Sequence, residues 1–445
     1  MITKELISPK SIVVVGGSDE TQKPGGAVLR NLRESNYKGK LYVVNPKSDF
    51  VQGIKCHKRV EELPQVDLAI LAIAAKMCPD SVEILCSKKM CKAVIILSAG
   101  FHEDGPEGAI LEEKIVEIVN RNGASLIGPN CIGVMTPNYT GIFTKPNPPL
   151  SENGVDLISG SGATVVFILE TALQLGVRVS SIFSVGNSAQ TGIEDVLEYL
   201  DETYIHKKSA PVKLLYIESI SYPEKLLKHA VSLINKGAKI AAIKSGTSDA
   251  GSRAASSHTG AMATPDSAVS ALFQKAGIVR CYSRTELVTV GAVMLNKLPK
   301  GDKVAIITHA GGPAVMLTDT LSEYNISIPH ISGEKADNLL KELYNGSSTS
   351  NPIDFLATGT ASQLAKIIDA CEKDFDVDSM VVIFGNPGLT SVYDVYETLF
   401  NKIKECNKPI FSILPSIVNA KDEIAKFKEM GGICFPDEVI FGNAL

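Results

Sequence analysis

The sequence predicts an α/β protein built from parallel sheets that are covered by helices on both faces. Short runs rich in Val and Ile alternate with longer helical stretches along the 445 residues, and this alternation is typical of parallel strands connected by helices. The chain also exceeds the roughly 250–300 residues at which a single hydrophobic core stops growing. We therefore expect about three domains.

The composition is that of an ordinary globular protein and argues against several classes of function. The chain is 44% hydrophobic and 21% charged, with a net charge of −5, which does not favour nucleic-acid binding. No apolar run approaches the roughly 18 residues of a membrane span, and the first residues do not resemble a signal peptide. The nine cysteines are scattered without a CxxC pair, so neither a zinc site nor a disulfide framework is predicted. We expect a protein of the reducing cytoplasm.

Strand-like runs and two breaks divide the chain into three expected domains, at 1–143, 151–296 and 301–445. A proline-rich linker covers 144–154, and a second break covers 297–302. The strands are predicted at 11–15, 41–44, 67–73, 93–97 and 125–127 in the first domain, at 155–158, 179–185, 213–219, 240–244 and 278–282 in the second, and at 303–308, 379–385 and 409–414 in the third.

The second and third domains resemble copies of one another. The run VDLISGSGATVV (155–166) aligns with VAIITHAGGPAV (304–315) at a constant offset of 149 residues, and the same offset extends without a gap to Ile326 and Ile328 of the next expected strand. Any two α/β domains share this rhythm, but the gapless register favours duplication. We predict a Rossmann-like domain followed by two flavodoxin-like domains.

The stretch VVVGGSDETQKPGGAVLRNL (13–32) predicts a strand, a glycine-rich turn and a helix in the first domain. This arrangement presents backbone N–H groups and a helix N-terminus to a phosphate, although it also occurs where only tight packing is needed. The dinucleotide fingerprint GxGxxG is absent, and the second strand leads to Lys47 instead of the acidic residue of an NAD site. A nucleotide with an additional phosphate, such as coenzyme A (CoA) or NADP, is favoured.

Two motifs in the second domain predict phosphate chemistry. SGSGAT (159–164) follows a strand and opens a helix, so its hydroxyl and N–H groups would suit an anion, although a tight turn capped by a serine explains the same pattern. AASSHTGAM (254–262) surrounds His258 with small residues, as expected where a large anion approaches an imidazole. Imidazole is a competent nucleophile toward an acyl phosphate when a partner holds its tautomer. Glu218, at the end of the strand 213–219, is the candidate partner.

These motifs resemble those of the NDP-forming acyl-CoA synthetases, and in particular the α subunits of ADP-forming acetate–CoA ligases. VVNPK (43–47), ILAIAAK (70–76), LSAGF (97–101) and IGPNCIGV (127–134) resemble the CoA-binding domain of that family. KSGTSDAGSRAASSHTGAMATPD (244–266) resembles its phosphohistidine loop. The resemblance extends over nearly the whole chain, because the third domain carries the matching THAGGPA and NPIDF.

The resemblance implies specific site residues. Contacts to CoA are expected from Gly16, Gly17, Ser18, Asp19, Lys47, Ile73, Ala74, Ala75, Ser98 and Asn130, phosphate contacts from Ser159, Gly160, Ser161 and Gly162, and catalysis from His258 and Glu218. The family usually has proline at the position of Ile73 and asparagine at that of His309. We predict that His309 is noncatalytic and that Cys131, which follows the GPN motif, is a buried packing residue.

The resemblance also implies a reaction and a partner. The expected reaction interconverts acyl-CoA, ADP and phosphate with a carboxylic acid, CoA and ATP, through an acyl phosphate and a phosphohistidine. Because no ATP-grasp module is present in the sequence, we expect an ATP-grasp β subunit that supplies ADP or ATP with Mg²⁺ in an α2β2 assembly. Two alternatives stay open: a noncatalytic acyl-CoA sensor or regulatory half of a protein acetyltransferase, and an NAD(P)-dependent oxidoreductase. The sequence specifies neither the acyl group nor the choice of ADP or GDP.

Overall fold

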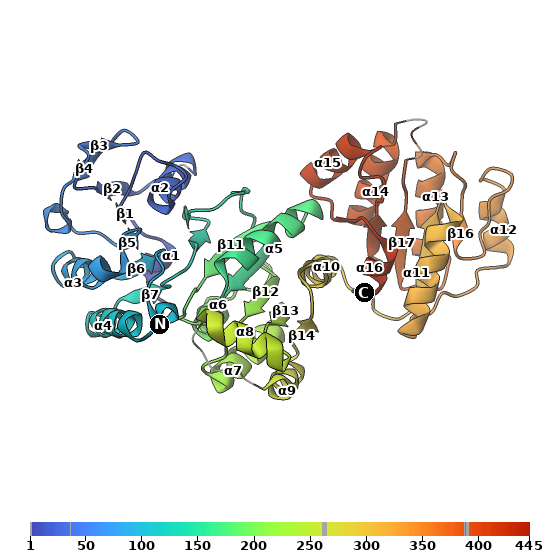
Figure 1. The fold of residues 1–445 in the computed structure, drawn as a ribbon. Helices are drawn as coiled ribbons and strands as arrows, with labels where there is room; N and C mark the ends of the chain where they lie inside the picture. The colour runs from blue at the N-terminus through green and yellow to red at the C-terminus, as the bar shows by residue number, and fades with distance from the viewer. Residues whose placement is uncertain (1, 36, 260–264, 387, 389–390) are drawn as a thin grey trace. The chain divides into compact units, whose positions relative to one another are not determined.

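The computed structural model describes the chain except residues 1, 36, 260–264, 387 and 389–390, and except the side chains of 255–259. The chain divides into two compact units (Figure 1). The first unit comprises Met1–Glu170 and Arg178–Leu287, and the second comprises Thr171–Val177 and Val288–Leu445. No helix in the described residues is long and apolar enough to span a bilayer.

The first sheet has the strand order β3-β4-β2-β1-β5-β6-β7, with parallel pairing except in the β3–β4 hairpin. Its strands are β1 (Ser11–Val15), β2 (Lys40–Val44), β3 (Phe50–Val51), β4 (Ile54–His57), β5 (Leu68–Leu71), β6 (Ala93–Ile96) and β7 (Ser125–Ile127). Its helices are α1 (Lys4–Ile7), α2 (Pro24–Glu34), α3 (Cys78–Lys88) and α4 (Pro106–Arg121), with short 3₁₀ helices η1 (Val60–Glu62), η2 (Ala75–Met77) and η3 (His102–Asp104).

Helices cover both faces of the first sheet, as the continuous apolar strands predict. In β1 the side chains of Ile12 and Val14 pack with Leu29 of α2, whereas Val13 and Val15 pack in the cluster that includes α3 and α4. Alternating strand residues point to opposite faces, so a strand buried on both sides must be apolar throughout. The predicted sheet of parallel strands between helices is therefore confirmed.

The second sheet has the order β14-β13-β12-β10-β11-β8-β9. Its strands are β8 (Gly133–Thr136), β9 (Tyr139–Ile142), β10 (Val155–Ser159), β11 (Val179–Ser184), β12 (Val212–Ile217), β13 (Lys239–Lys244) and β14 (Val279–Cys281). Its helices are α5 (Gly162–Gln174), α6 (Ile193–Glu202), α7 (Pro223–Asn235), α8 (Asp249–Thr259), α9 (Asp266–Ala276) and α10 (Arg284–Leu295). The β8–β9 hairpin, which the sequence analysis missed, pairs antiparallel with β11 and covers what would be an open strand edge.

The third sheet, in the second unit, has the order β16-β15-β17-β18-β19 with parallel pairing. Its strands are β15 (Val304–Thr308), β16 (Ile353–Asp354), β17 (Ser379–Ile383), β18 (Ile410–Ile413) and β19 (Cys434–Phe435). Its helices are α11 (Gly311–Glu323), α12 (Glu334–Leu340), α13 (Ala361–Lys373), α14 (Tyr393–Glu405), α15 (Lys421–Glu429) and α16 (Glu438–Gly442). Each strand whose bounds were predicted from the sequence is present in the three sheets, with bounds shifted by at most two residues, whereas the strand expected around Ile326 and Ile328 is not formed.

The duplication is visible in the bounds of the elements. β10 and α5 correspond to β15 and α11, residue for residue, at the predicted offset. The expected next strand of the third domain is reduced to one bridge between Ser327 and Lys303, whereas β11 is a full strand in the second. Pro329 follows at once, and a proline has no N–H to donate to a strand ladder.

Candidate functional site

The predicted CoA contacts gather at the carboxyl edge of the first sheet. The chain leaves β1 toward β2 on one side, while β5 lies on the other, and such a reversal opens the crevice in which α/β proteins bind ligands. Gly16 and Ile73 flank this point, since a Cβ on Gly16 would lie 2.8 Å from Cγ2 of Ile73. The structure thus brings together loops that are distant in the sequence.

The glycine-rich turn after β1 requires glycine for steric reasons. Gly16 has a φ of +88°, and a Cβ there would lie 2.4 Å from the carbonyl oxygen of Ala72. A Cβ on Gly25 would lie 2.1 Å from the carbonyl oxygen of Gly16, so the first turn of α2 packs directly against the loop. Pro24 at the first helical position leaves no unsatisfied N–H of its own.

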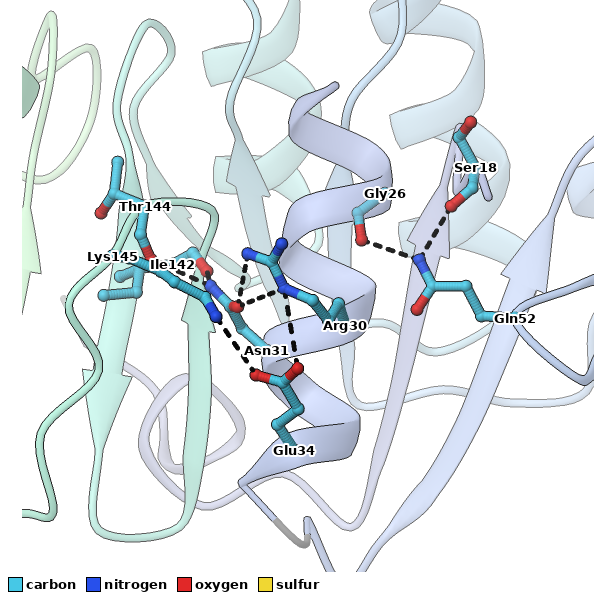
Figure 2. A network of polar contacts seen from close by, with 9 residues as sticks. All are labelled: Ser18, Gly26, Arg30, Asn31, Glu34, Gln52, Ile142, Thr144 and Lys145. Atoms are coloured by element: carbon cyan, nitrogen blue, oxygen red, sulfur yellow. Dashed lines mark hydrogen bonds and ion pairs between the residues drawn. The ribbon is translucent and has the colours of Figure 1, made fainter. Parts of the chain in front are cut away.

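A glutamine from the β3–β4 hairpin fixes this turn (Figure 2). Nε2 of Gln52 donates to the carbonyl oxygens of Ser18 and Gly26, both at 2.8 Å, and its backbone N–H donates to Oδ1 of Asp19 at 2.6 Å. Asp19 and Ser18, both predicted CoA contacts, are therefore held from outside the loop. The sequence analysis missed Gln52, although Gln52 and Gly53 both adopt positive φ, which is the hairpin turn that glycine signals.

The remaining predicted CoA contacts lie on neighbouring loops of the same edge. Lys47 is exposed, and its backbone N–H donates to Oδ1 of Asn45 at 2.8 Å, while Nδ2 of Asn45 donates to the carbonyl oxygen of Gly17 at 2.8 Å. The Ser98 hydroxyl donates to the carbonyl oxygen of Ile73 at 2.5 Å, and the carbonyl oxygen of Ser98 accepts from the N–H of Asn130 at 2.9 Å. Ala74 and Ala75 lie beside Ile73 where η2 begins.

These residues fit a phosphorylated nucleotide such as CoA. The glycine turn, the exposed Lys47 and the polar residues Ser98 and Asn130 lie on neighbouring loops at one edge of the sheet, and backbone N–H groups at such a turn suit a phosphate. A larger cleft of about 940 Å³ lies elsewhere in the first unit, lined among others by Lys10, Tyr37 and Pro149. None of the predicted site residues contributes to its lining, so its size alone does not mark it as the active site.

A smaller cleft opens at the carboxyl edge of the second sheet. It has a volume of about 30 Å³ and is lined by Gly160, Gly186, Asn187, Ser188, Ile193, Glu218 and Ser219. Glu218 follows β12 and faces the turn after β10, because a Cβ on Gly160 would lie 3.5 Å from Cγ of Glu218. The structure thus places two of the predicted site residues in one cleft.

Part of the SGSGAT turn is used by the fold. The buried hydroxyl of Ser159 donates to the carbonyl oxygen of Ser161 at 2.7 Å, and the N–H of Gly160 donates to that of Tyr216 at 3.0 Å. The Ser161 hydroxyl accepts from the N–H of Thr164 at 3.4 Å. We expected the Ser159 hydroxyl and the Gly160 N–H to bind an anion, but both already donate within the fold. Gly162, where α5 begins, remains a candidate anion contact.

The segment around His258 is partly helical. Its backbone belongs to α8, which runs to Thr259, whereas the resemblance led us to expect a loop over 254–262. The Ser248 hydroxyl accepts from the N–H of Gly251, and the Ser248 carbonyl oxygen accepts from the N–H of Ser252. The alanines that follow favour a helix. The His258 side chain lies outside the described residues, so its pairing with Glu218 stays a prediction.

The two sheet edges are joined through Asn187, which follows β11. Its backbone N–H donates to the carbonyl oxygen of Pro129 at 3.0 Å, and its Oδ1 accepts from Nδ2 of Asn130 at 3.4 Å. Its Nδ2 donates to Oε2 of Glu112 at 3.0 Å and also to Oε2 of Glu103. Both glutamates belong to the first domain, and the sequence analysis missed them.

The pKa values of the two glutamates are shifted in opposite directions. Burial by itself raises the pKa of Glu103, but hydrogen bonds from Asn187 and from the N–H groups of Gly100 and Phe101 bring it below the usual value. Burial raises the pKa of Glu112 overall, although the Asn187 amide lowers it in part. Glu103 is therefore the firmly ionised acceptor of the pair.

Two further residues singled out in the sequence are held by contacts within their own domains. Burial raises the pKa of Cys131 to about 12, so its thiol stays protonated, as a packing residue would. His309 lies at the edge of the third sheet, where Nε2 accepts from the N–H of Gly385 at 2.7 Å and the ring contacts Phe384. Burial lowers its pKa.

The comparisons with known proteins agree with this geometry. Residues 10–137 match the family described as CoA binding domain, and residues 152–294 match the family described as succinyl-CoA ligase like flavodoxin domain. The α subunit of ADP-forming acetate–CoA ligase II from Pyrococcus furiosus is 33% identical over 416 residues, which cover 92% of this chain and 89% of that protein.

Longer relatives match as well. ADP-forming acetate–CoA ligase I from Archaeoglobus fulgidus is 32% identical over 404 residues, which cover 91% of this chain but 58% of that protein, so the chain spans little more than half of that relative. Among solved structures, a dinucleotide-forming acetyl-coenzyme A synthetase 1 from Ca. Korarchaeum cryptofilum, in complex with phosphate and ADP, matches with a TM-score of 0.87 at 26% identity, covering 99% of this chain and 95% of that chain. The chain therefore belongs to the family of ADP-forming acetate–CoA ligases.

Proposed function

We propose that the chain is the α subunit of an ADP-forming acyl-CoA synthetase. The observation that carries the proposal is the hydrogen-bonded contact between the GPN loop and the loop after β11, which brings Asn130 of the candidate CoA site to Asn187 of the cleft that holds Glu218. A site in which phosphate takes the acyl group from acyl-CoA and the phosphoryl group then passes to a histidine needs these two edges side by side. The family relationship supplies the expected chemistry.

The proposed reaction has two steps on this chain. A phosphate oxygen attacks the thioester carbon of acyl-CoA; a C–O bond forms, the C–S bond breaks, and CoA leaves as the thiol with the proton of the phosphate. A ring nitrogen of His258 then attacks phosphorus; a P–N bond forms, the P–O bond to the acyl group breaks, and the carboxylate leaves. Glu218 is proposed to hold the tautomer and to stabilise the charged imidazole.

The last step is assigned to a partner. An ATP-grasp β subunit, with ADP and Mg²⁺, would accept the phosphoryl group as the P–N bond breaks and ATP forms. The naming of two relatives as α subunits supports a partner, and the α2β2 assembly and the cytoplasmic location remain part of the proposal. The purified chain should therefore bind acyl-CoA and become phosphorylated, but it should show no ligase turnover without the partner.

A labelling experiment tests the proposal. Incubation of the chain with acetyl-CoA and radiolabelled phosphate should place an acid-labile, base-stable label on the protein, as expected for a phosphohistidine. His258→Ala should abolish the label and leave CoA binding intact, whereas the double variant Ser256→Ala/Ser257→Ala serves as a matched control that keeps the label. An acid-stable label, or a label that survives His258→Ala, would refute the assignment. Failure of any label to form with intact acetyl-CoA binding would favour a noncatalytic sensor.

A further inference from the structure

We propose that Asn187 is a positioning residue that aligns bound acyl-CoA with phosphate, and that Glu103 and Glu112 fix its orientation. This inference rests on the proposed function and gives a role to residues to which the sequence analysis gave none. It starts from Asn187, which contacts the GPN loop, lines the cleft that contains Glu218 and donates to two carboxylates.

The chemistry of the contacts determines how the Asn187 amide is turned. An ionised carboxylate only accepts hydrogen bonds, so the NH₂ group of the amide must face Glu103 and Glu112. The opposite orientation would place the amide oxygen against two carboxylates. Oδ1 of Asn187 therefore points to Nδ2 of Asn130, which in turn fixes the Asn130 amide with its NH₂ toward Asn187 and its oxygen away from it.

The carboxylates are themselves held firmly. Oε1 of Glu103 accepts from the N–H groups of Gly100 at 2.7 Å and Phe101 at 3.3 Å. Glu112 is 9% exposed, and its Oε2 also accepts from the N–H of His102 at 3.4 Å. Buried polar groups of this kind are costly to leave unpaired, so the orientation of Asn187 is well determined before any ligand binds.

The backbone around Asn187 is equally constrained. A Cβ on Gly186 would lie 2.2 Å from the carbonyl oxygen of Pro129, and the N–H of Ala189 donates to the carbonyl oxygen of Gly128 at 3.3 Å. The loop after β11 therefore packs backbone to backbone on the GPN loop. The two loops form one rigid contact, and Asn187 lines the same cleft as Glu218.

The same network reaches the helix that carries His258. Glu103 belongs to η3, and η3 packs beside α8. Asn187 and Glu103 thus connect three parts of the site: the candidate CoA contact Asn130, the cleft that contains Glu218, and the backbone of α8. Misplacement of reacting groups by about 1 Å lowers rates by about a hundredfold, so this network acts on the step in which phosphate meets the thioester.

Two sources of the labelled phosphoryl group distinguish this role from a purely structural one. Acetyl-CoA with labelled phosphate requires the aligned attack, whereas labelled acetyl phosphate delivers its phosphoryl group to His258 without CoA. For Asn187→Asp, which sets a third carboxylate against Glu103 and Glu112, we expect labelling from acetyl-CoA and phosphate to slow by about a hundredfold. Labelling from acetyl phosphate should change by less than about threefold, and CoA affinity should be nearly unchanged. Asn187→Leu should give the same split.

A second variant restores the pairing of an amide with a carboxylate at positions 187 and 112. In Asn187→Asp/Glu112→Gln, the new amide at position 112 donates to the new carboxylate, so most of the acetyl-CoA-dependent rate should return. Asn138→Asp, the same exchange at an exposed site in the turn of the β8–β9 hairpin of the second sheet, is the matched control and should behave as the wild type.

The outcomes are distinguishable from a failure of the proposed function. If the wild type takes no label from either donor, the proposed function fails. If the wild type is labelled but Asn187→Asp and Asn187→Leu keep its rate from acetyl-CoA and phosphate, this inference alone is overturned. It is equally overturned if both variants slow labelling from the two donors to the same extent, because that result shows a structural role only.

Discussion

The Gln52 contacts allow a quantitative test of how the glycine turn binds a phosphorylated nucleotide. Nε2 of Gln52 makes two hydrogen bonds of 2.8 Å to backbone carbonyl oxygens of the turn and of α2. The variant Gln52→Met keeps the length and the unbranched shape of the side chain at a φ of +47° and removes only the amide. The backbone contact from position 52 to Asp19 remains possible.

The magnitude follows from the two lost contacts. A hydrogen bond contributes about 1 kcal/mol net, so the turn is expected to lose about 2 kcal/mol of local stabilisation. If the turn must then be ordered when CoA binds, up to that amount is subtracted from the free energy of binding. A loss of about 1.4–2 kcal/mol corresponds to a dissociation constant raised by about ten- to thirtyfold.

Isothermal titration with CoA and backbone hydrogen exchange of residues 16–26 provide the assay. Faster exchange in this segment together with weaker CoA binding supports the reasoning. Gln65→Met, at an exposed glutamine of the same domain, is the control and should change neither quantity. Unchanged CoA affinity in Gln52→Met, with exchange in the turn clearly faster, would refute the idea that the ordered turn is part of the binding site.

Three further outcomes are expected. Lys47→Ala should weaken CoA binding by roughly 1–3 kcal/mol, as for the loss of a charge-assisted hydrogen bond, measured by the same titration. Glu218→Gln should keep the fold by circular dichroism but lower the yield of acid-labile label, because a neutral amide stabilises a charged imidazole less well. Burial raises the pKa of Asp201, but hydrogen bonds from Lys236 and His229 outweigh it and lower the pKa overall. The stability that this carboxylate contributes is present above its unfolded pKa of about 3.9 and is lost as the pH falls through the folded value. Asp201→Asn should therefore lower the free energy of unfolding by about 2 kcal/mol at pH 7, less than for a fully buried pair because Lys236 is partly exposed, and by less at pH 3; an equal loss at both values would contradict the assignment.

The sequence predicted the main parallel strands because each is a run of apolar residues bounded by turn residues. β1 and β15 are buried on both faces, and such strands are recognisable without knowledge of their neighbours. The hairpins were missed because β3 has two residues and β8 has four. Strands this short carry too few residues for an alternating pattern, and their existence depends on the edge that they cover.

The candidate site was predictable where motifs follow strands and was missed where contacts are made across the fold. Asn130 and Lys47 come directly after strands of the first sheet, so the edge they share follows from parallel topology. Glu103 and Glu112 face Asn187 from a 3₁₀ turn and a helix. No spacing in the sequence relates them to residue 187, because the pairing is set by how the two sheets pack in the first unit.

The duplicated domains differ in the residues that occupy one corresponding pair of positions at the sheet edge. At the predicted offset Gly160 corresponds to His309, and the matching strand registers, Ser159 with Tyr216 and Thr308 with Ile383, place Glu218 in correspondence with Gly385. The second domain thus has a small residue opposite a carboxylate, and the third has a large ring opposite a glycine.

This exchange has a direct consequence at the third edge. The imidazole of His309 occupies the space in the third domain that corresponds to the one Gly160 leaves open in the second. It accepts from the N–H of Gly385, and its ring contacts Phe384. With Nε2 engaged as an acceptor and the pKa lowered by burial, the ring is neutral and directed into its own domain. A carboxylate in the place of Glu218 is also missing there. The prediction that His309 is noncatalytic follows from these contacts, and it requires that His309→Asn, the residue usual in the family, leave the labelling of His258 unchanged.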